Sequence, residues 1–228
     1  MVHILAVGAH PDDIELGFGG SIARFVEEGF SVALLDLTNG EPTPKGDPVT
    51  RAKECAQATE ILGVKTRITL DLPNRTLTDT VEARVKVAEV YRELRPEMIF
   101  LHGETDAHPD HMAAWQIAHK ARFHAKLTKT DMKGEPWYPK KEFLFLASHL
   151  NLQVDPAFIL DVSSTFEKKL EAARAYKSQF AANGREEFLI EKLTAHASHY
   201  GSLIGVKYGE PVMLKEPLGL ASVRDIIL

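Results

Sequence analysis

The sequence predicts an α/β fold: a Rossmann-like, mostly parallel sheet flanked by helices on both faces and followed by a C-terminal extension. Short apolar runs alternate with longer segments whose apolar residues recur at helical spacing. This alternation favours a parallel sheet with right-handed crossovers. The length of 228 residues, 44% of them hydrophobic and 26% charged, suits one large α/β domain. We therefore expect residues 1–228 to form a single domain.

The first half of the chain alternates four predicted strands with four predicted helices. The strand-like apolar runs are Val2–Gly8, Ser31–Thr38, Thr66–Leu72 and Met98–His102. The helical patterns run from Leu16 up to Gly29, from Pro48 to about Leu62, and over Val81–Leu94 and Pro109–Ala125. Asp47 suits the N-cap of the second helix, with Pro48 at its first position. Arg95 and Pro96 end the third helix.

The order of these units favours Rossmann-like winding, in which strand four returns to lie beside strand one. The second half predicts strands in FLFLAS (143–148) and AFILDV (157–162), helices near Thr165–Phe180 and Arg185–Leu203, and an extended C-terminal segment. Between the halves, Lys126–Lys141 is a basic insertion. It is either a solvated loop or a mobile rim over the site.

Composition excludes several classes of protein. A net charge of -5 provides no overall attraction to nucleic acid or to an anionic membrane surface. Cys55 is the only cysteine, so the chain forms no intramolecular disulfide and no multi-cysteine metal site, and we expect this residue to be buried. The N-terminus, MVHILAVGAHPDD, lacks the features of a signal peptide, and no apolar segment has membrane length. We expect a cytoplasmic protein.

Two loops place imidazole and carboxylate groups at the carboxyl ends of strands one and four. They read AHPDDIELGFGGS (9–21) and ETDAHPDHMAA (104–114). If these strands are neighbours, the following side chains meet where open α/β sheets bind ligands: His10, Asp12, Asp13, His108, Asp110 and His111. The positive end of a helix dipole accounts for carboxylates but disfavours charged histidine. The histidines are therefore expected to bind a metal or to pair with carboxylates.

A catalytic zinc ion typically has three protein ligands and one open position. His10, Asp13 and His111 fit that number. Spacing alone leaves Asp12 and His108 open as ligands, and iron or manganese accepts the same mixed set of nitrogen and oxygen donors.

The HPDD and HPDH motifs of these loops closely resemble those of the LmbE-like, or PIG-L, N-acetylglucosaminide deacetylases. Further similarity lies in DDIELGFGG, PVTRAKECAQATEILGV, AYKSQF and YGSLIGVKYGEP, which resemble the branch that includes the bacillithiol-biosynthesis deacetylases. The paired motifs are specific, whereas the C-terminal similarity is weaker. Many relatives have glutamate directly after the second aspartate; here Ile14 intervenes, and we interpret Glu15 as structural.

This resemblance implies a role for each residue of the two motifs. His10, Asp13 and His111 would be the metal ligands and Asp12 the general base. His108 would stabilise the tetrahedral intermediate in its protonated form, with Asp110 as the carboxylate that orients it and favours its charge. The ion would be Zn²⁺, or Fe²⁺ or another divalent ion, and related proteins are often homo-oligomers, including hexamers.

The reaction implied is hydrolysis of the N-acetyl group of an N-acetylglucosamine-type glycoside, with N-acetylglucosaminyl malate of bacillithiol biosynthesis as the preferred substrate. Arg51, in the first turn of its helix, is a candidate to bind a sugar hydroxyl or an anionic aglycone. Tyr200, with His199 and Glu210, is a candidate to close the pocket, although a packing role is the more frequent one for such residues.

Three other functions compete with deacetylation. A dinucleotide-binding domain would use Asp36 as its ribose-binding acid, but Gly17, Gly19 and Gly20 do not form GxGxxG. A metal-dependent phosphoester hydrolase could use similar ligands, yet it would usually place more basic residues near the metal. A structural zinc protein would need a fourth ligand, which His108 could supply.

Overall fold

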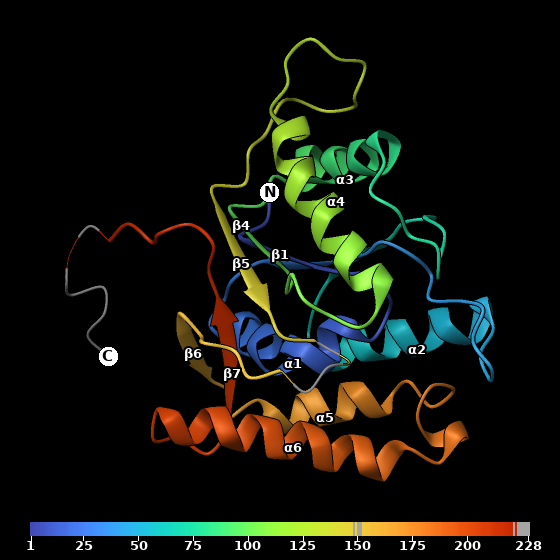
Figure 1. Cartoon of the computed structure of the whole chain (residues 1–228), viewed down its shortest axis with the longest axis vertical. Helices are drawn as coiled ribbons and strands as arrows, with labels where there is room; N and C mark the ends of the chain where they lie inside the picture. Colours follow the sequence, from blue (N-terminus) through green and yellow to red (C-terminus); the bar gives the residue numbers. More distant parts are fainter. Residues whose placement is uncertain (148, 150–151, 221, 223–228) are drawn as a thin grey trace.

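A seven-stranded sheet in the order β3-β2-β1-β4-β5-β7-β6 forms the centre of the computed structural model, which describes residues 1–147, 149, 152–220 and 222 (Figure 1). The strands are β1 (Ile4–Gly8), β2 (Val32–Asp36), β3 (Thr66–Thr69), β4 (Met98–His102), β5 (Lys141–Phe145), β6 (Phe158–Asp161) and β7 (Gly209–Met213). The pairings from β3 through β5 are parallel. Strand β4 lies beside β1, which confirms the predicted Rossmann-like order.

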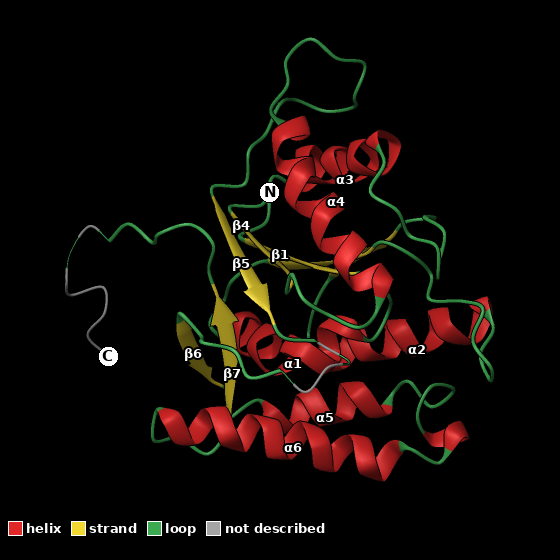
Figure 2. Ribbon diagram, in the orientation of Figure 1, coloured by secondary structure: helices red, strands yellow, loops and turns green. Residues whose placement is uncertain are grey.

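Helices cover both faces of this sheet (Figure 2). They are α1 (Asp13–Glu27), α2 (Pro48–Ile61), α3 (Val81–Leu94), α4 (Pro109–Ala125), α5 (Phe166–Arg174) and α6 (Glu186–Leu203). Strand residues alternate between two apolar cores: Leu5 packs with α3 and α4, whereas Ile4 packs with α1, α2 and α5. Both faces of the central strands are therefore buried, as parallel sheets require. Among the described residues, no helix is both long and apolar enough to cross a membrane.

The predicted ends of α2 and α3 are correct, because the residues that cap these helices are adjacent to them in the sequence. The Asp47 side chain accepts hydrogen bonds from the backbone N–H groups of Val49 and Thr50, and Pro48 begins α2. Helix α3 ends at Arg95, whose φ is 51°. Cys55, on the inner face of α2, is buried as expected.

The glycines of α1 allow close packing. A Cβ at Gly17 would lie 2.6 Å from the Cβ of Ala147, and one at Gly20 would lie 2.9 Å from that of Val162. Segments after β5 and β6 thus approach the helix backbone more closely than any side chain would permit. This packing explains the glycines without a bound dinucleotide.

The helix predicted over Thr165–Phe180 ends at Arg174, six residues early. The buried carboxylate of Glu54 accepts two 2.7 Å hydrogen bonds from Ser178, one from its backbone N–H and one from its hydroxyl. The Tyr176 hydroxyl also donates to Glu15 at 2.9 Å. These long-range contacts hold residues 176–180 in turns against α1 and α2.

Part of the extended C-terminal segment forms an interior strand of the sheet, β7, next to the edge strand β6. Strand β7 pairs antiparallel with both β5 and β6, so it separates two strands that are successive along the chain. The segment GEPVM contains Pro211 and shows no clear alternation, which is why its sequence indicated only extended structure.

The Lys126–Lys141 segment does not form a rim over the site. It follows α4, which returns the chain to the amino ends of the strands, opposite the predicted site (Figure 1). The Arg92 guanidinium donates hydrogen bonds to the carbonyls of Leu127, Met132 and Gly134 and holds the loop against α3. The hypothesis of a mobile rim was wrong because it ignored the direction of α4.

Candidate metal and catalytic site

The loops after β1 and β4 meet at the carboxyl edge of the sheet. His10 lies just before α1, whose first residue is Asp13, and His108 is the N-cap of α4. The His10 ring centroid lies 4.9 Å from that of His108 and 5.4 Å from that of His111. Neighbouring parallel strands bring these remote segments together, as expected from the strand order.

Asp13 is the centre of this cluster. Its Oδ1 lies 3.0 Å from His111 Nε2, and its Oδ2 lies 3.3 Å from His10 Nδ1 and 3.2 Å from His102 Nε2. Oδ2 also accepts a 2.8 Å hydrogen bond from the His10 backbone N–H. Burial alone would raise the pKa of Asp13, but the charges of His111, His10 and His102 together hold this pKa well below its usual value.

The donor atoms of His10, Asp13 and His111 could hold a divalent cation. One donor atom from each lies within 4.8 Å of the others, as is also true of His10, His108 and Asp110. Zinc bonds of about 2.0–2.2 Å in tetrahedral geometry imply ligand separations of about 3.3 Å. The contacts of Asp13 with His111 and His10, at 3.0 and 3.3 Å, match that spacing.

The carboxylates around His10 and His111 raise the pKa values of both imidazoles. Burial lowers the pKa of His10, but Asp13, Asp110 and Asp12 outweigh it and raise this pKa to about 9. Burial acts likewise on His111, whose pKa is nevertheless raised to about 10 by Asp13 and Asp106. Both rings are therefore protonated at neutral pH, and an incoming metal ion would displace the protons.

Each candidate ligand has an outer partner that fixes its orientation. Asp106 Oδ2 lies 2.7 Å from His111 Nδ1, Asp110 Oδ2 lies 3.1 Å from His10 Nε2, and His102 supports Asp13. Such partners set the tautomer of a ligating histidine. Sequence reasoning assigned no role to Asp106 or His102. Their positions within the HPDH loop and at the last residue of β4 were the available signals.

Asp12 lies beside the candidate ligands in a strained backbone conformation, with φ of 117°. Its side chain is 15% exposed, and its Oδ2 accepts a 2.9 Å hydrogen bond from Arg51. Burial raises the pKa of Asp12, Arg51 opposes that rise and Asp13 adds to it, leaving a value of about 7. A carboxyl with such a pKa exchanges protons readily near neutral pH.

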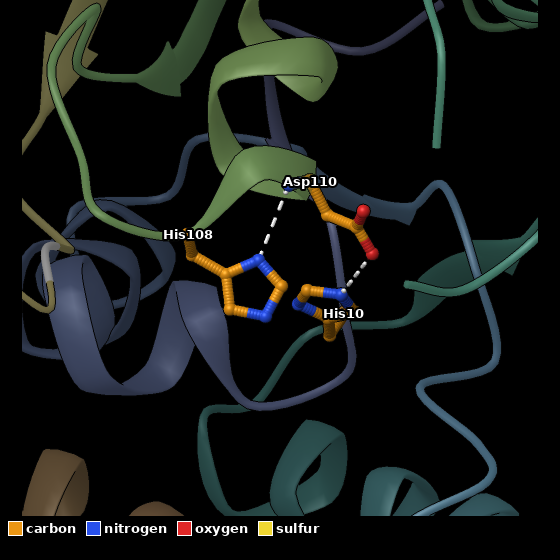
Figure 3. Close-up of side chains that lie close together, drawn as sticks. All are labelled: His10, His108 and Asp110. Atoms are coloured by element: carbon orange, nitrogen blue, oxygen red, sulfur yellow. Dashed lines mark hydrogen bonds and ion pairs between the residues drawn. The ribbon is translucent and has the colours of Figure 1, made fainter. Parts of the chain in front are cut away.

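The contacts of His108 and Asp110 differ from those expected. The Asp110 carboxylate contacts His10, whereas His108 Nδ1 accepts a 3.2 Å hydrogen bond from the Asp110 backbone N–H (Figure 3). Burial and the charges of His111 and His10 lower the pKa of His108 to about 4. His108 is thus a neutral ring with its proton on Nε2, and the expected cationic form, paired with the Asp110 carboxylate, is corrected.

A cavity of about 340 Å³ opens onto this cluster. Its walls include His10, Asp12, Asp13, His108, His111, Arg51, His149, Asn74, Arg75, Thr43, Gln179 and Phe180. Distant parts of the chain thus contribute to one cavity, including the turns after α5. Sequence reasoning missed the contributions of Asn74, Arg75 and His149.

Three residues proposed for substrate contact lie elsewhere or are already paired. Tyr200, 2% exposed, is not among the described residues that line this cavity and packs against His196 and His199. Glu210 is buried, accepting hydrogen bonds from Lys169 and from two backbone N–H groups of α1. Arg51 does line the cavity, but its side chain is 4% exposed. Its guanidinium contacts Asp12, Glu41 and the Pro11 carbonyl.

Glu15 is fully buried and does not line the cavity. Its Oε1 accepts hydrogen bonds from Arg67 at 2.5 Å and from Tyr176 at 2.9 Å. These contacts join α1 to β3 and to the turns after α5, which agrees with the structural role expected for this residue.

Comparisons with known proteins find one matching family model and several similar chains. The family model PIG-L, GlcNAc-PI de-N-acetylase, matches residues 5–122. The diacetylchitobiose deacetylase of Thermococcus kodakarensis is 30% identical over 92% of this chain and 81% of that protein. The Bacillus anthracis protein named "Probable N-acetyl-alpha-D-glucosaminyl L-malate deacetylase 2" is 29% identical over 81% of this chain and 84% of its own. The crystal structure of the conserved protein TT1542 from Thermus thermophilus matches with a TM-score of 0.88 and 38% identity, covering 97% of this chain and 98% of that one.

Proposed function

Because this chain belongs to the PIG-L family of de-N-acetylases, we propose that it is a metal-dependent hydrolase that removes the acetyl group from an N-acetylglucosamine-type sugar. One observation carries the proposal: His10 and His111 contact opposite oxygens of the Asp13 carboxylate, directly beside the carboxyl of Asp12. The arrangement offers a three-ligand site with an adjacent base, open to a cavity of sugar-accommodating size.

In this proposal His10 Nδ1, Asp13 and His111 Nε2 hold the ion, which is Zn²⁺ or, with the same donors, Fe²⁺ or another divalent ion. Such an ion, when bound, supplies Lewis acidity that lowers the pKa of water and polarises a carbonyl. Asp106 and Asp110 keep the two imidazoles oriented through their outer nitrogens. His108 stays outside this set, so the site keeps an open position for water or substrate.

Asp12 and His108 then have complementary tasks. Arg51 engages Oδ2 of Asp12, so Oδ1 is the oxygen that takes a proton from the attacking water. The water oxygen bonds to the acetyl carbon, the C–N bond breaks, and the sugar nitrogen takes up the proton that Asp12 removed from the water. His108 donates a hydrogen bond from Nε2 to the carbonyl oxygen as its negative charge develops. The products are acetate and a free amine.

Two relatives suggest what the sugar is attached to. Their names specify N-acetylglucosaminyl malate and diacetylchitobiose. Acetate release from the malate glycoside, diacetylchitobiose and free N-acetylglucosamine, measured with metal-loaded protein, tests the proposal. We expect release from at least one substrate, its loss on chelation and its return with added metal. A preference for the malate glycoside would support a role in bacillithiol biosynthesis.

The same assay can contradict the proposed deacetylase activity. Metal-loaded protein that releases no acetate from any of the three sugars would contradict the proposed activity. Phosphate release from phosphoester substrates under these conditions would favour the phosphoester hydrolase instead.

Metal binding is expected to release close to two protons per ion at pH 7, because the pKa values of His10 and His111, about 9 and about 10, keep both rings protonated. Only neutral imidazole binds a metal, so affinity should rise with pH, by up to about 100-fold per pH unit below the lower of these pKa values. Calorimetry in buffers of different ionisation enthalpy counts the protons. Release of fewer than about one proton would contradict these assignments.

Asp106→Asn is expected to weaken metal affinity by about 10–100-fold, because the His111 ring loses the carboxylate that orients it. Competition with a chromophoric chelator measures this affinity. Asp161→Asn is the control, since Asp161, the last residue of β6, also accepts a backbone hydrogen bond from the residue two positions ahead but lies outside the cavity. An unchanged metal affinity in Asp106→Asn would show that Asp106 does not support metal binding.

We also propose that residues 1–228 act as one domain. Buried contacts between distant parts support it, such as Glu54 with Ser178 and Glu15 with Tyr176. The homo-oligomer, for which a hexamer is the expected form, stays a prediction that analytical ultracentrifugation tests.

A further inference from the structure

The loop between β3 and α3 is attached to the candidate site through Asp110. The Asp110 carboxylate accepts a 2.6 Å hydrogen bond from the Arg75 backbone N–H at Oδ2 and a 3.2 Å hydrogen bond from that of Leu77 at Oδ1. Oδ2 of Asp110 also contacts His10 Nε2 at 3.1 Å. One carboxylate oxygen thus joins the backbone of Arg75 to the ring of a proposed metal ligand, so this loop forms a fixed wall of the cavity.

Arg75 adopts a backbone conformation that favours glycine. Its φ is 68°, in the left-handed region, where the Cβ of an arginine is sterically disfavoured. Among the described residues, two other non-glycine residues have positive φ: Asp12, inside the site, and Arg95, at the end of α3. Strain of this kind concentrates at functional sites because a folded chain retains it only where the surrounding contacts enforce it.

The guanidinium of Arg75 is available for a ligand. Arg75 lines the cavity and is exposed, and no ion pair or side-chain hydrogen bond connects it to the described residues. Arg51, the other arginine of the cavity wall, already contacts Asp12 and Glu41. The cavity therefore offers one guanidinium that has no ion-pair partner among the described residues.

We propose that Arg75 is a specificity-determining residue that selects sugars whose aglycone carries an oxyanion. This inference rests on the proposed deacetylase function and names the substrate class within it. A guanidinium binds carboxylate or phosphate oxygens through two parallel N–H groups. Asp12, His108 and Arg75 line the same cavity, so a sugar whose acetyl group lies at Asp12 and His108 would offer its aglycone to the wall that carries Arg75.

The test compares the kcat/KM ratio of anionic to neutral substrates in wild type and in Arg75→Gly. Glycine tolerates the positive φ and retains the backbone N–H that contacts Asp110, so the loop keeps its geometry. The anionic substrates are N-acetylglucosaminyl malate and N-acetylglucosamine 1-phosphate. The neutral substrate is diacetylchitobiose. We expect the wild type to prefer an anionic substrate. In Arg75→Gly the ratio of kcat/KM for anionic over neutral substrates should fall about 10–100-fold, because a charged hydrogen bond is lost. The anionic substrate whose kcat/KM falls more identifies the recognised oxyanion as carboxylate or phosphate.

Arg95→Gly is the matched control, because it removes the same charge and the same backbone strain at the opposite edge of the sheet, where Arg95 stacks on Trp137 at 4.4 Å. It should keep the wild-type ratio, and Arg75→Lys should restore part of it. An unchanged ratio in Arg75→Gly, or an equal fall in Arg95→Gly, overturns the role of Arg75 while acetate release continues. Absence of acetate from every substrate in wild type overturns the proposed function instead.

Discussion

Asp12→Asn is expected to lower kcat for acetate release by about 10²–10⁴-fold, the usual contribution of a general base. The amide cannot take the proton of the attacking water, yet its oxygen can still accept the hydrogen bond from Arg51. Because Asp12 is outside the proposed ligand set, the metal content should stay near that of wild type. Steady-state kinetics together with elemental analysis of the purified variant measures both quantities.

His108→Ala tests the second residue that is proposed to act on the substrate without binding the metal. It should also lower kcat with the metal retained, because His108 donates to the substrate oxygen and is not a proposed ligand. Loss of metal from either variant would mean that the altered residue is a ligand and that its assigned role is wrong.

Asp13→Asn is expected to abolish activity by abolishing metal binding. Asp13 contacts His10, His102 and His111 together, and its charge raises the pKa of both candidate ligand histidines. We expect metal affinity to fall by more than the roughly 10–100-fold typical of outer partners. Calorimetric titration with zinc measures the loss.

Asp12→Asn and Asp13→Asn form a matched pair. The two residues are adjacent, both substitutions are nearly isosteric, and each removes one carboxylate from the cavity wall. The account requires opposite outcomes: metal kept in the first variant and lost in the second. Equal metal contents in the two would show that the roles of neighbouring aspartates have been misassigned.

The order of β1 to β4 and most element boundaries could be predicted. The boundaries have local signals, and the order follows from the alternation of strands and helices. Apolar runs mark β1, β2 and β4, and Asp47 with Pro48 marks the start of α2. The end of α5 and the position of β7 depend on partners far along the chain, such as Glu54 for Ser178 and β5 for β7. No local pattern contains that information, so those expectations were wrong or incomplete.

The candidate site, too, could be predicted only in part. The HPDD and HPDH loops could be placed together from topology, whereas the partner of each polar atom could not. Asp110 lies near two histidines, and the first turn of α4 directs its carboxylate to His10 while its backbone N–H faces His108. Arg75 gave no signal in the sequence, because its relevance comes from its backbone conformation and its place in the cavity wall.

The most direct test of the central claim is a crystal structure of the zinc-loaded protein with anomalous data collected at the zinc edge. The account predicts one strong peak about 2.0–2.2 Å from His10 Nδ1, an oxygen of Asp13 and His111 Nε2, with His108 unbound and the fourth position free of protein atoms. A peak enclosed by four protein ligands including His108, or no peak between residues 10, 13 and 111, would contradict it.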